Sequence, residues 1–120
     1  GLRQAILPLA ARLHIPSSHV HAVDIICDDN GHYLDFDRHS PLAQSGGKAV
    51  VCRQINPGAE LSMVLIGDGK TDLEAQNAGA KVIGFGGVVR RELVESQADS
   101  FVSDSSLLAV LPFILQADSK

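Results

Sequence analysis

The chain has 120 residues, of which 45% are hydrophobic, and its ten basic and fourteen acidic residues leave a net charge of −4. This length supports one modest core and excludes a second complete domain. The charge is too small and too scattered to indicate a surface for nucleic acid or anionic membrane. No apolar stretch reaches the roughly eighteen residues that a membrane span needs, and Cys27 and Cys52 lack a metal-type spacing. We therefore expect a reduced, cytoplasmic protein.

The first third of the chain predicts a helix and then a hairpin. Apolar residues recur at helical spacing from Leu2 to Leu13. A run rich in β-branched residues, Val20 to Cys27, and the shorter run His32 to Phe36 follow as expected strands. Asn30-Gly31 lies between these runs and is a strong signal for a tight turn. The segment therefore predicts an antiparallel β-hairpin.

The remainder alternates apolar runs of strand type with segments of helical spacing. The expected strands are Leu61 to Ile66, Val82 to Phe85 and Phe101 to Ser103, and the expected helices are Lys48 to Ile55, Leu73 to Ala78, Val88 to Ser96 and a last helix ending at Ile114. Gly79 is expected to stop the second helix, and Asp104 or Ser105 to cap the last one. This order predicts an α/β fold with a parallel sheet and an inserted hairpin.

The loop Gly67-Asp68-Gly69-Lys70-Thr71-Asp72 directly follows the expected strand ending at Ile66. Gly-Asp-Gly is common turn chemistry and is consistent with a purely structural role. Its position between a strand and a helix, with another strand beyond, places it at the carboxyl end of a parallel strand, where ligands bind in open α/β sheets. Carboxylate oxygens in such a loop suit Mg²⁺, which is usually held by one or two carboxylates together with water and phosphate oxygens. The loop therefore indicates phosphoryl-transfer chemistry.

Three motifs in succession resemble phosphoserine phosphatases of the haloacid dehalogenase superfamily. They are Ser45-Gly46-Gly47-Lys48, then Gly67 to Ala75, and then Ile83-Gly84-Phe85-Gly86-Gly87. The resemblance extends over nearly the whole chain, and it implies a Rossmann-like haloacid dehalogenase core. It further implies that residues 1–120 form a single partial domain, without the family's first strand and cap.

The resemblance also implies roles for individual residues. Lys48 would contact the phosphoryl group, Asp68 would bind Mg²⁺, Thr71 would touch the substrate, and Asp72 would hydrogen-bond around the metal and the lysine. A lysine at a helix start beside glycine-rich backbone is physically suited to stabilise charge on phosphoryl oxygens. Gly1 resembles the end of the family's second motif, where it would keep a backbone contact to phosphate.

The family's nucleophile is an aspartate in an Asp-x-Asp-x-Thr motif near the N-terminus, which this sequence does not contain there. The similar spelling Asp35-Phe36-Asp37 follows the expected hairpin instead of a buried parallel strand. We therefore interpret it as a solvated strand end. The nucleophile is expected from outside these 120 residues, because covalent catalysis of this type requires it.

Four further residues have weaker signals. Arg3 is expected to be a structural charge at the helix start, and Arg91 a surface residue more than a site residue. His19 and His21 alternate along the expected strand, so both rings could face one side, but two histidines without a third ligand make a weak metal site.

Two classes of function follow. The first is a Mg²⁺-dependent phosphatase that hydrolyses O-phosphoserine to serine and phosphate in serine biosynthesis, or acts on another small phosphomonoester. The second is an inactive fragment that binds Mg²⁺, phosphate or a partner. The 120 residues alone are expected to be inactive. Because a missing central strand would expose apolar sheet edges, we expect a homodimer or dependence on the missing N-terminal segment.

Overall fold

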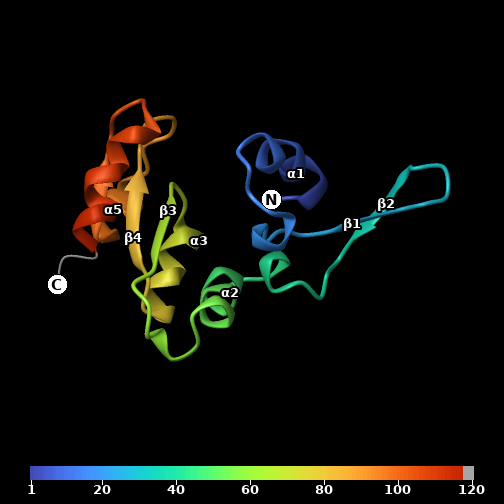
Figure 1. Cartoon of the computed structure of the whole chain (residues 1–120), viewed down its shortest axis with the longest axis horizontal. Helices are drawn as coiled ribbons and strands as arrows, with labels where there is room; N and C mark the ends of the chain where they lie inside the picture. Colours follow the sequence, from blue (N-terminus) through green and yellow to red (C-terminus); the bar gives the residue numbers. More distant parts are fainter. Residues whose placement is uncertain (118–120) are drawn as a thin grey trace. The chain divides into compact units, whose positions relative to one another are not determined.

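The structure is a computed structural model that describes residues 1–117 (Figure 1). The chain divides into two compact units, Gly1–Gly47 and a second that begins at Lys48. Each unit has its own core and is described separately below. The assignment of residues 1–120 to a single partial domain stays a prediction.

The first unit begins with helix α1, Arg3–Arg12, followed by a turn of 3-10 helix, η1, at Ser17–His19. Its core is small: Ala10, Val20 and Ala22 are buried, and Ile6 and Leu7 pack against them. The chain start is tied down by backbone pairing, since the Gly1 carbonyl accepts a hydrogen bond from the Val23 N–H at 3.0 Å. The Arg3 side chain pairs with Asp24 at 2.7 Å and also donates to the carbonyls of Val20 and Ala22. Arg3 thus has the structural role expected of it.

The predicted hairpin is present, but its first strand is much shorter than the apolar run indicated. Strand β1 spans Ile25–Cys27 and pairs antiparallel with β2, Tyr33–Phe36. The expected strand from Val20 is wrong in its first half, because backbone groups there bond to the chain start and to η1. His19 therefore ends a 3-10 helix, and His21 lies in a loop, so the two do not alternate along one strand.

The second unit is built on a parallel sheet of three strands in the order β3-β4-β5. These strands span Val64–Gly67, Lys81–Phe85 and Ser100–Val102. Strand β4 lies in the centre, with Gly67 of β3 paired with Gly84. Strand β3 begins three residues later than the apolar run predicted. The parallel pairing confirms the predicted α/β class.

Helical segments precede, connect and follow these strands. The α-helices are α2 (Gly47–Ile55), α3 (Lys70–Leu73), α4 (Glu92–Gln97) and α5 (Leu111–Ala117), and the 3-10 segments include η4 (Glu74–Ala78) and η5 (Leu107–Val110). Gly79 ends η4 with a φ of 83°, as its position predicted.

Two expected helix starts are wrong. The helix expected from Val88 begins at Glu92, because residues 86–91 form the connection after β4. The last helical segment is capped by Ser106, whose hydroxyl accepts from the Leu108 N–H, and not by Asp104 or Ser105. The Asp104 carboxylate accepts a hydrogen bond from the Ser106 N–H, so it stabilises the turn directly before the capping residue.

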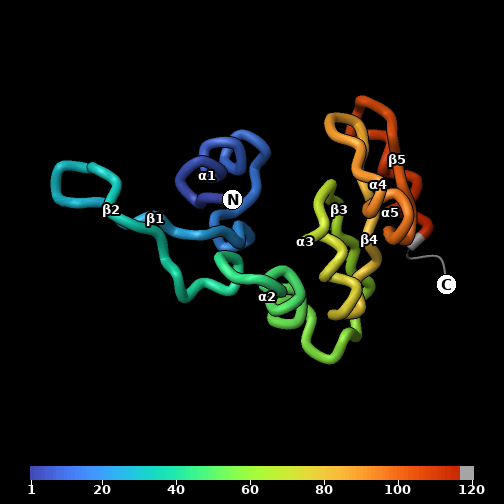
Figure 2. The backbone as a smooth tube through the Cα atoms, turned by 180° about the vertical axis from the view of Figure 1, so that it is seen from behind, coloured from blue at the N-terminus to red at the C-terminus, as the bar shows by residue number. Residues whose placement is uncertain are grey.

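Alternate residues of β4 are buried on opposite faces of the sheet. Val82 is fully buried with Ala75 and Val94 on the face covered by α3, η4 and α4. Ile83 packs with Val102 and Val110 on the face covered by η5 and α5. Figure 2 shows α4, α5 and β5 from behind. This two-sided burial explains why the strand reads as a continuous apolar run. No helix within residues 1–117 has both the length and the apolar character to cross a membrane.

Candidate functional site

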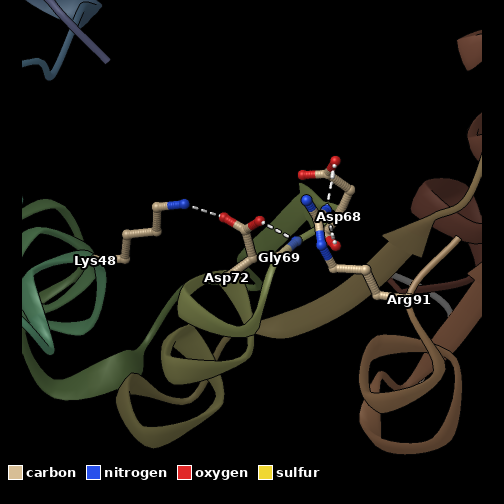
Figure 3. A network of polar contacts seen from close by, with 5 residues as sticks. All are labelled: Lys48, Asp68, Gly69, Asp72 and Arg91. Atoms are coloured by element: carbon tan, nitrogen blue, oxygen red, sulfur yellow. Dashed lines mark hydrogen bonds and ion pairs between the residues drawn. The ribbon is translucent and has the colours of Figure 1, made fainter. Parts of the chain in front are cut away.

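The candidate site lies at the carboxyl ends of the parallel strands in the second unit (Figure 3). Strand β3 ends at Gly67, and α3 begins at Lys70 after a two-residue loop. The connection after β4 leads to Arg91 at the same sheet edge, because parallel strands end on the same side. Two loops that are separate in sequence therefore meet there.

Asp72 is the buried carboxylate of the site, with 7% of its surface exposed. Its Oδ2 accepts from the Gly69 N–H at 2.9 Å, and its Oδ1 forms an ion pair with the Lys48 ammonium. The contact to Gly69 is the carboxylate half of a capping box at the start of α3. A buried charge that is both paired and hydrogen-bonded avoids the cost of an isolated one. Asp72 therefore fixes the position of Lys48.

Lys48 reaches this carboxylate from the first turn of α2, 24 residues away in sequence. Its side chain is 38% exposed, so the ammonium is held by Asp72 and also remains accessible from solvent. A positioned and accessible positive charge can stabilise an anion at this edge of the sheet. The predicted association of Lys48 with Asp72 is present in the structure.

Gly67 is required at the strand end because the Asp72 side chain lies directly against it. A Cβ atom added at Gly67 would lie 2.1 Å from Cγ of Asp72. A neighbouring glycine is less constrained: a Cβ at Gly69 would meet nothing closer than 3.5 Å. The first glycine of the loop thus makes room for the buried carboxylate.

Asp68 is the open carboxylate of the site, with a side chain that is 50% exposed. Nη1 of Arg91 donates to its Oδ2 and also to its backbone carbonyl, each at 2.9 Å. The expectation that Arg91 belongs to the surface more than to the site is therefore wrong. Its guanidinium is half-exposed and also bound to the residue predicted to hold the metal. The loop connecting β4 to α4 brings it there. The signal in the sequence is the family resemblance, in which an arginine also follows the glycine doublet Gly86-Gly87.

The two remaining predicted residues are not tested by these contacts. Thr71 lies exposed on α3, in the loop segment that carries Asp68 and Asp72. Gly1 belongs to the first unit. Their proposed contacts to substrate and phosphate stay predictions.

The chemistry of Asp68 fits a hard divalent cation, because an accessible carboxylate is the type of ligand that Mg²⁺ takes. Within residues 1–117, no three His, Cys, Asp or Glu side chains lie close enough together to hold a metal by themselves. Asp68 could supply one ligand, and a cation bound here would need its remaining ligands from water, substrate or other residues.

The acidic segment at the end of the hairpin has a different environment. Asp35 pairs with Arg38 at 2.9 Å, and this arginine, together with the N–H of Phe36, holds the pKa of the Asp35 carboxyl below its usual range. Arg38 also lies over the Phe36 ring, 4.5 Å from its centroid. Asp37 accepts from the His39 N–H at 3.0 Å. These local contacts fit the predicted solvated strand end.

Known proteins similar to this chain include several phosphoserine phosphatases. The chain is 41% identical over 102 residues to the chloroplastic phosphoserine phosphatase of Arabidopsis thaliana, with 82% of this chain covered and 35% of the relative. It is 37% and 36% identical over 105 residues to the phosphoserine phosphatases of Bos taurus and Homo sapiens, with 87% of this chain and 47% of each relative covered. The chain thus spans less than half the length of these relatives. No protein-family model matches the sequence.

Solved structures agree with this relationship. A phosphoserine phosphohydrolase-like protein from Francisella tularensis superposes with a TM-score of 0.75 at 26% identity, over 92% of this chain and 51% of the other. The structure of DsGPDH of Dunaliella salina superposes with a TM-score of 0.66 at 33% identity, over 87% of this chain and 18% of that one. The resemblance and the fold class predicted from the motifs are confirmed.

Proposed function

We propose that this chain is part of a phosphoserine phosphatase of the haloacid dehalogenase superfamily and forms the phosphate-binding side of a Mg²⁺-dependent phosphatase. The observation that carries this proposal is the ion pair between Lys48 and the buried Asp72, next to the open carboxylate of Asp68. Together, a fixed cation and an exposed carboxylate at one strand end could bind a phosphoryl group and its metal ion. The relatives that share this segment are named as phosphoserine phosphatases.

Lys48 would stabilise negative charge on the transferring phosphoryl group. Asp72 prevents the flexible lysine from adopting other positions, because it holds the ammonium from a buried site. Preorganised charge of this kind costs little reorganisation during the reaction. Thr71 would donate its hydroxyl to the substrate, and Gly1 a backbone contact to phosphate.

Asp68 would hold the Mg²⁺ ion. When bound, such an ion neutralises charge on phosphoryl oxygens and orients them for an in-line displacement. Asp68 contributes one hard oxygen ligand from a short loop fixed at both ends by β3 and α3.

The nucleophile and the acid/base would be aspartates supplied by sequence outside these 120 residues. This is consistent with the chain spanning 35% to 47% of the lengths of its relatives. The 120 residues alone would then bind Mg²⁺ or phosphate without hydrolysing a substrate. This corresponds to the alternative of an inactive binding fragment. The reaction would pass through an aspartyl phosphate that water hydrolyses.

O-phosphoserine is the substrate we favour, which would place the reaction in serine biosynthesis. The likeness to DsGPDH, a chain of which this segment covers 18%, shows the same fold in a protein of another name. Another small phosphomonoester is therefore the second candidate. The proposed contacts of Lys48, Thr71 and Gly1 are to the phosphate end of the substrate, which both candidates share.

Hydrolysis assays test the proposal directly. The protein that contains this chain should release phosphate from O-phosphoserine in the presence of Mg²⁺, faster than from a panel of other small phosphomonoesters. The same assay on the 120 residues alone should show no turnover. Robust turnover by the 120 residues would refute an external nucleophile, and a preference for another phosphomonoester would select the second candidate.

We also propose how the chain assembles and where it is located. Strand β3 forms one edge of the described sheet, with Ile66 37% exposed, so we propose that a second copy or sequence outside this chain covers it. Light scattering of the purified protein would distinguish a homodimer from a monomer. The cytoplasmic location can be tested by imaging the tagged protein, and one relative is named as chloroplastic.

A further inference from the structure

Arg91 binds the residue that the proposed function assigns to the metal. We propose that Arg91 is a built-in counter-ion for Asp68, which a divalent cation has to displace, so that Arg91 weakens metal binding at this site. The inference rests on the proposed function only in that Asp68 is taken as a metal ligand. It concerns how metal affinity is set, and it does not depend on which phosphomonoester is hydrolysed.

The contact is specific to one residue of the loop. The same nitrogen of Arg91, Nη1, donates to the Asp68 carboxylate and to the Asp68 carbonyl, both at 2.9 Å. Figure 3 shows the guanidinium reaching across from the α4 side of the site. A cation that binds the carboxylate meets a positive charge already in contact with one of its two oxygens. Like charges at such short separation repel, so the two cations compete for Asp68.

The neighbouring arginine shows that this contact is not a general property of the segment. Arg90 forms a salt bridge with Glu95 of α4, and its guanidinium lies 5.5 Å from the centroid of the Phe101 ring. Two consecutive arginines therefore have different partners. Arg90 is tied to α4 and β5, whereas Arg91 is tied to the loop after β3.

The exposure of the pair makes the exchange feasible. The side chains of Arg91 and Asp68 are 48% and 50% exposed, so water can solvate both groups once they separate. Ion pairs with this exposure are weak, and many contribute little to stability. The other ion pair of the site differs, because Asp72 is buried. If Lys48 moved away, it would leave this buried carboxylate without a compensating charge. We therefore expect a metal to displace Arg91 and to leave Lys48 in place.

The test is metal affinity, measured on the protein that contains this chain. Mn²⁺ binding is followed by electron paramagnetic resonance of the free ion and Mg²⁺ binding by calorimetry, without substrate. Arg91→Gln should tighten both by about twofold to fivefold, the upper part of the range expected for loss of a half-exposed ion pair. Arg90→Gln removes the same charge one residue away and should change the affinity by less than about twofold. Arg91→Lys keeps the charge and should restore an affinity close to wild type.

Two further arms make the result decisive. Asp68→Asn should abolish the tight binding phase, which confirms that the measured ion is at Asp68. In the unmodified protein, the Arg91 Nε–H resonance should shift during a Mg²⁺ titration while that of Arg90 stays in place, which tests the exchange even if a variant folds poorly.

Several outcomes would overturn the inference. They are unchanged or weaker metal binding in Arg91→Gln, equal tightening in Arg90→Gln, or wild-type metal binding in Asp68→Asn. Phosphate release is measured separately. A protein that exchanges Arg91 for metal but hydrolyses no phosphomonoester would refute the proposed function alone, and an active protein with unchanged affinity in Arg91→Gln would refute this inference alone.

Discussion

Two segments of this chain contain paired aspartates next to a cation, and their surroundings differ completely. The loop Gly67–Asp72 follows a parallel strand, and its second carboxylate is buried and bound to a lysine 24 residues away. The segment Asp35–Asp37 ends an antiparallel hairpin, and its carboxylates bind groups within three residues of themselves.

The difference shows what makes an acidic segment a candidate site. In the hairpin, each aspartate side chain accepts hydrogen bonds from groups close to it in sequence, Asp35 from Arg38 and Asp37 from the His39 N–H. In the loop, the carboxylates hold cations from other elements of the fold, Lys48 from α2 and Arg91 from the connection after β4. Long-range contacts bring together charges that can act on a third group. We therefore expect equivalent substitutions in the two segments to have very different effects.

Removing Lys48, the lysine of α2 that pairs with Asp72 of the loop, should have the largest effect. Lys48→Ala should lower kcat for phosphomonoester hydrolysis by about 100- to 1,000-fold, the cost typical of losing one preorganised donor to a developing charge. Arg38→Ala, which removes the cation of the hairpin, should change kcat by less than about twofold. Steady-state kinetics of the protein that contains this chain measures both. Near-normal rates in Lys48→Ala would remove the lysine from the mechanism.

Neutralising one aspartate in each segment should change the metal affinity only when the aspartate belongs to the loop. Asp68→Asn should weaken Mg²⁺ binding by about 10- to 100-fold or more, since even partners that only orient metal ligands have effects of this size. Asp35→Asn should leave the affinity unchanged, because Asp35 is committed to Arg38. Calorimetric titration with Mg²⁺ distinguishes the two, and equal losses in both variants would contradict the assignment of the metal to the loop.

A methyl group at the strand end should test the packing of the buried carboxylate. Gly67→Ala places a Cβ 2.1 Å from Cγ of Asp72 and should destabilise the fold by about 1–3 kcal/mol, as overpacking does. Gly69→Ala is the matched control, since its Cβ would make only ordinary contact at 3.5 Å. Urea unfolding midpoints measure the difference. Similar midpoints for the two variants would show that Asp72 moves aside without cost.

The order of elements and one half of the site could be predicted from the sequence. Apolar runs in β4 and the motif loop after β3 are local signals, and the Asn30-Gly31 turn correctly indicated the hairpin. The pairing of Lys48 with Asp72 could be anticipated because both belong to motifs with a family resemblance. Local sequence signals were sufficient to predict the hairpin turn, strand β4 and the loop after β3, and the family resemblance was needed for the pairing of Lys48 with Asp72.

Two of the failures involve partners that are distant in sequence. The apolar run from Val20 is not a strand in its first half, because its backbone bonds to Gly1 and to η1. The family resemblance includes an arginine after the glycine doublet, but the residues around Arg91 do not indicate its partner. Only the fold brings it to Asp68, 23 residues away. Such contacts are set by sheet topology, which no short window of sequence contains.

The smallest expected effect concerns the pKa of the hairpin carboxylate. The hydrogen bond from Arg38 and the Phe36 N–H favour the ionised form, so Asp35 should titrate below its usual pKa. Any stability that this gives is present above the usual aspartate pKa and is lost as the pH falls through the lowered value. Arg38→Gln should raise the pKa of Asp35 toward its usual range and leave phosphate release unchanged. Carbon-detected NMR titration measures the pKa. An unchanged value in Arg38→Gln would show that the arginine does not compensate Asp35, and the hairpin carboxylate would then lack the kind of counter-ion that Asp68 has in Arg91.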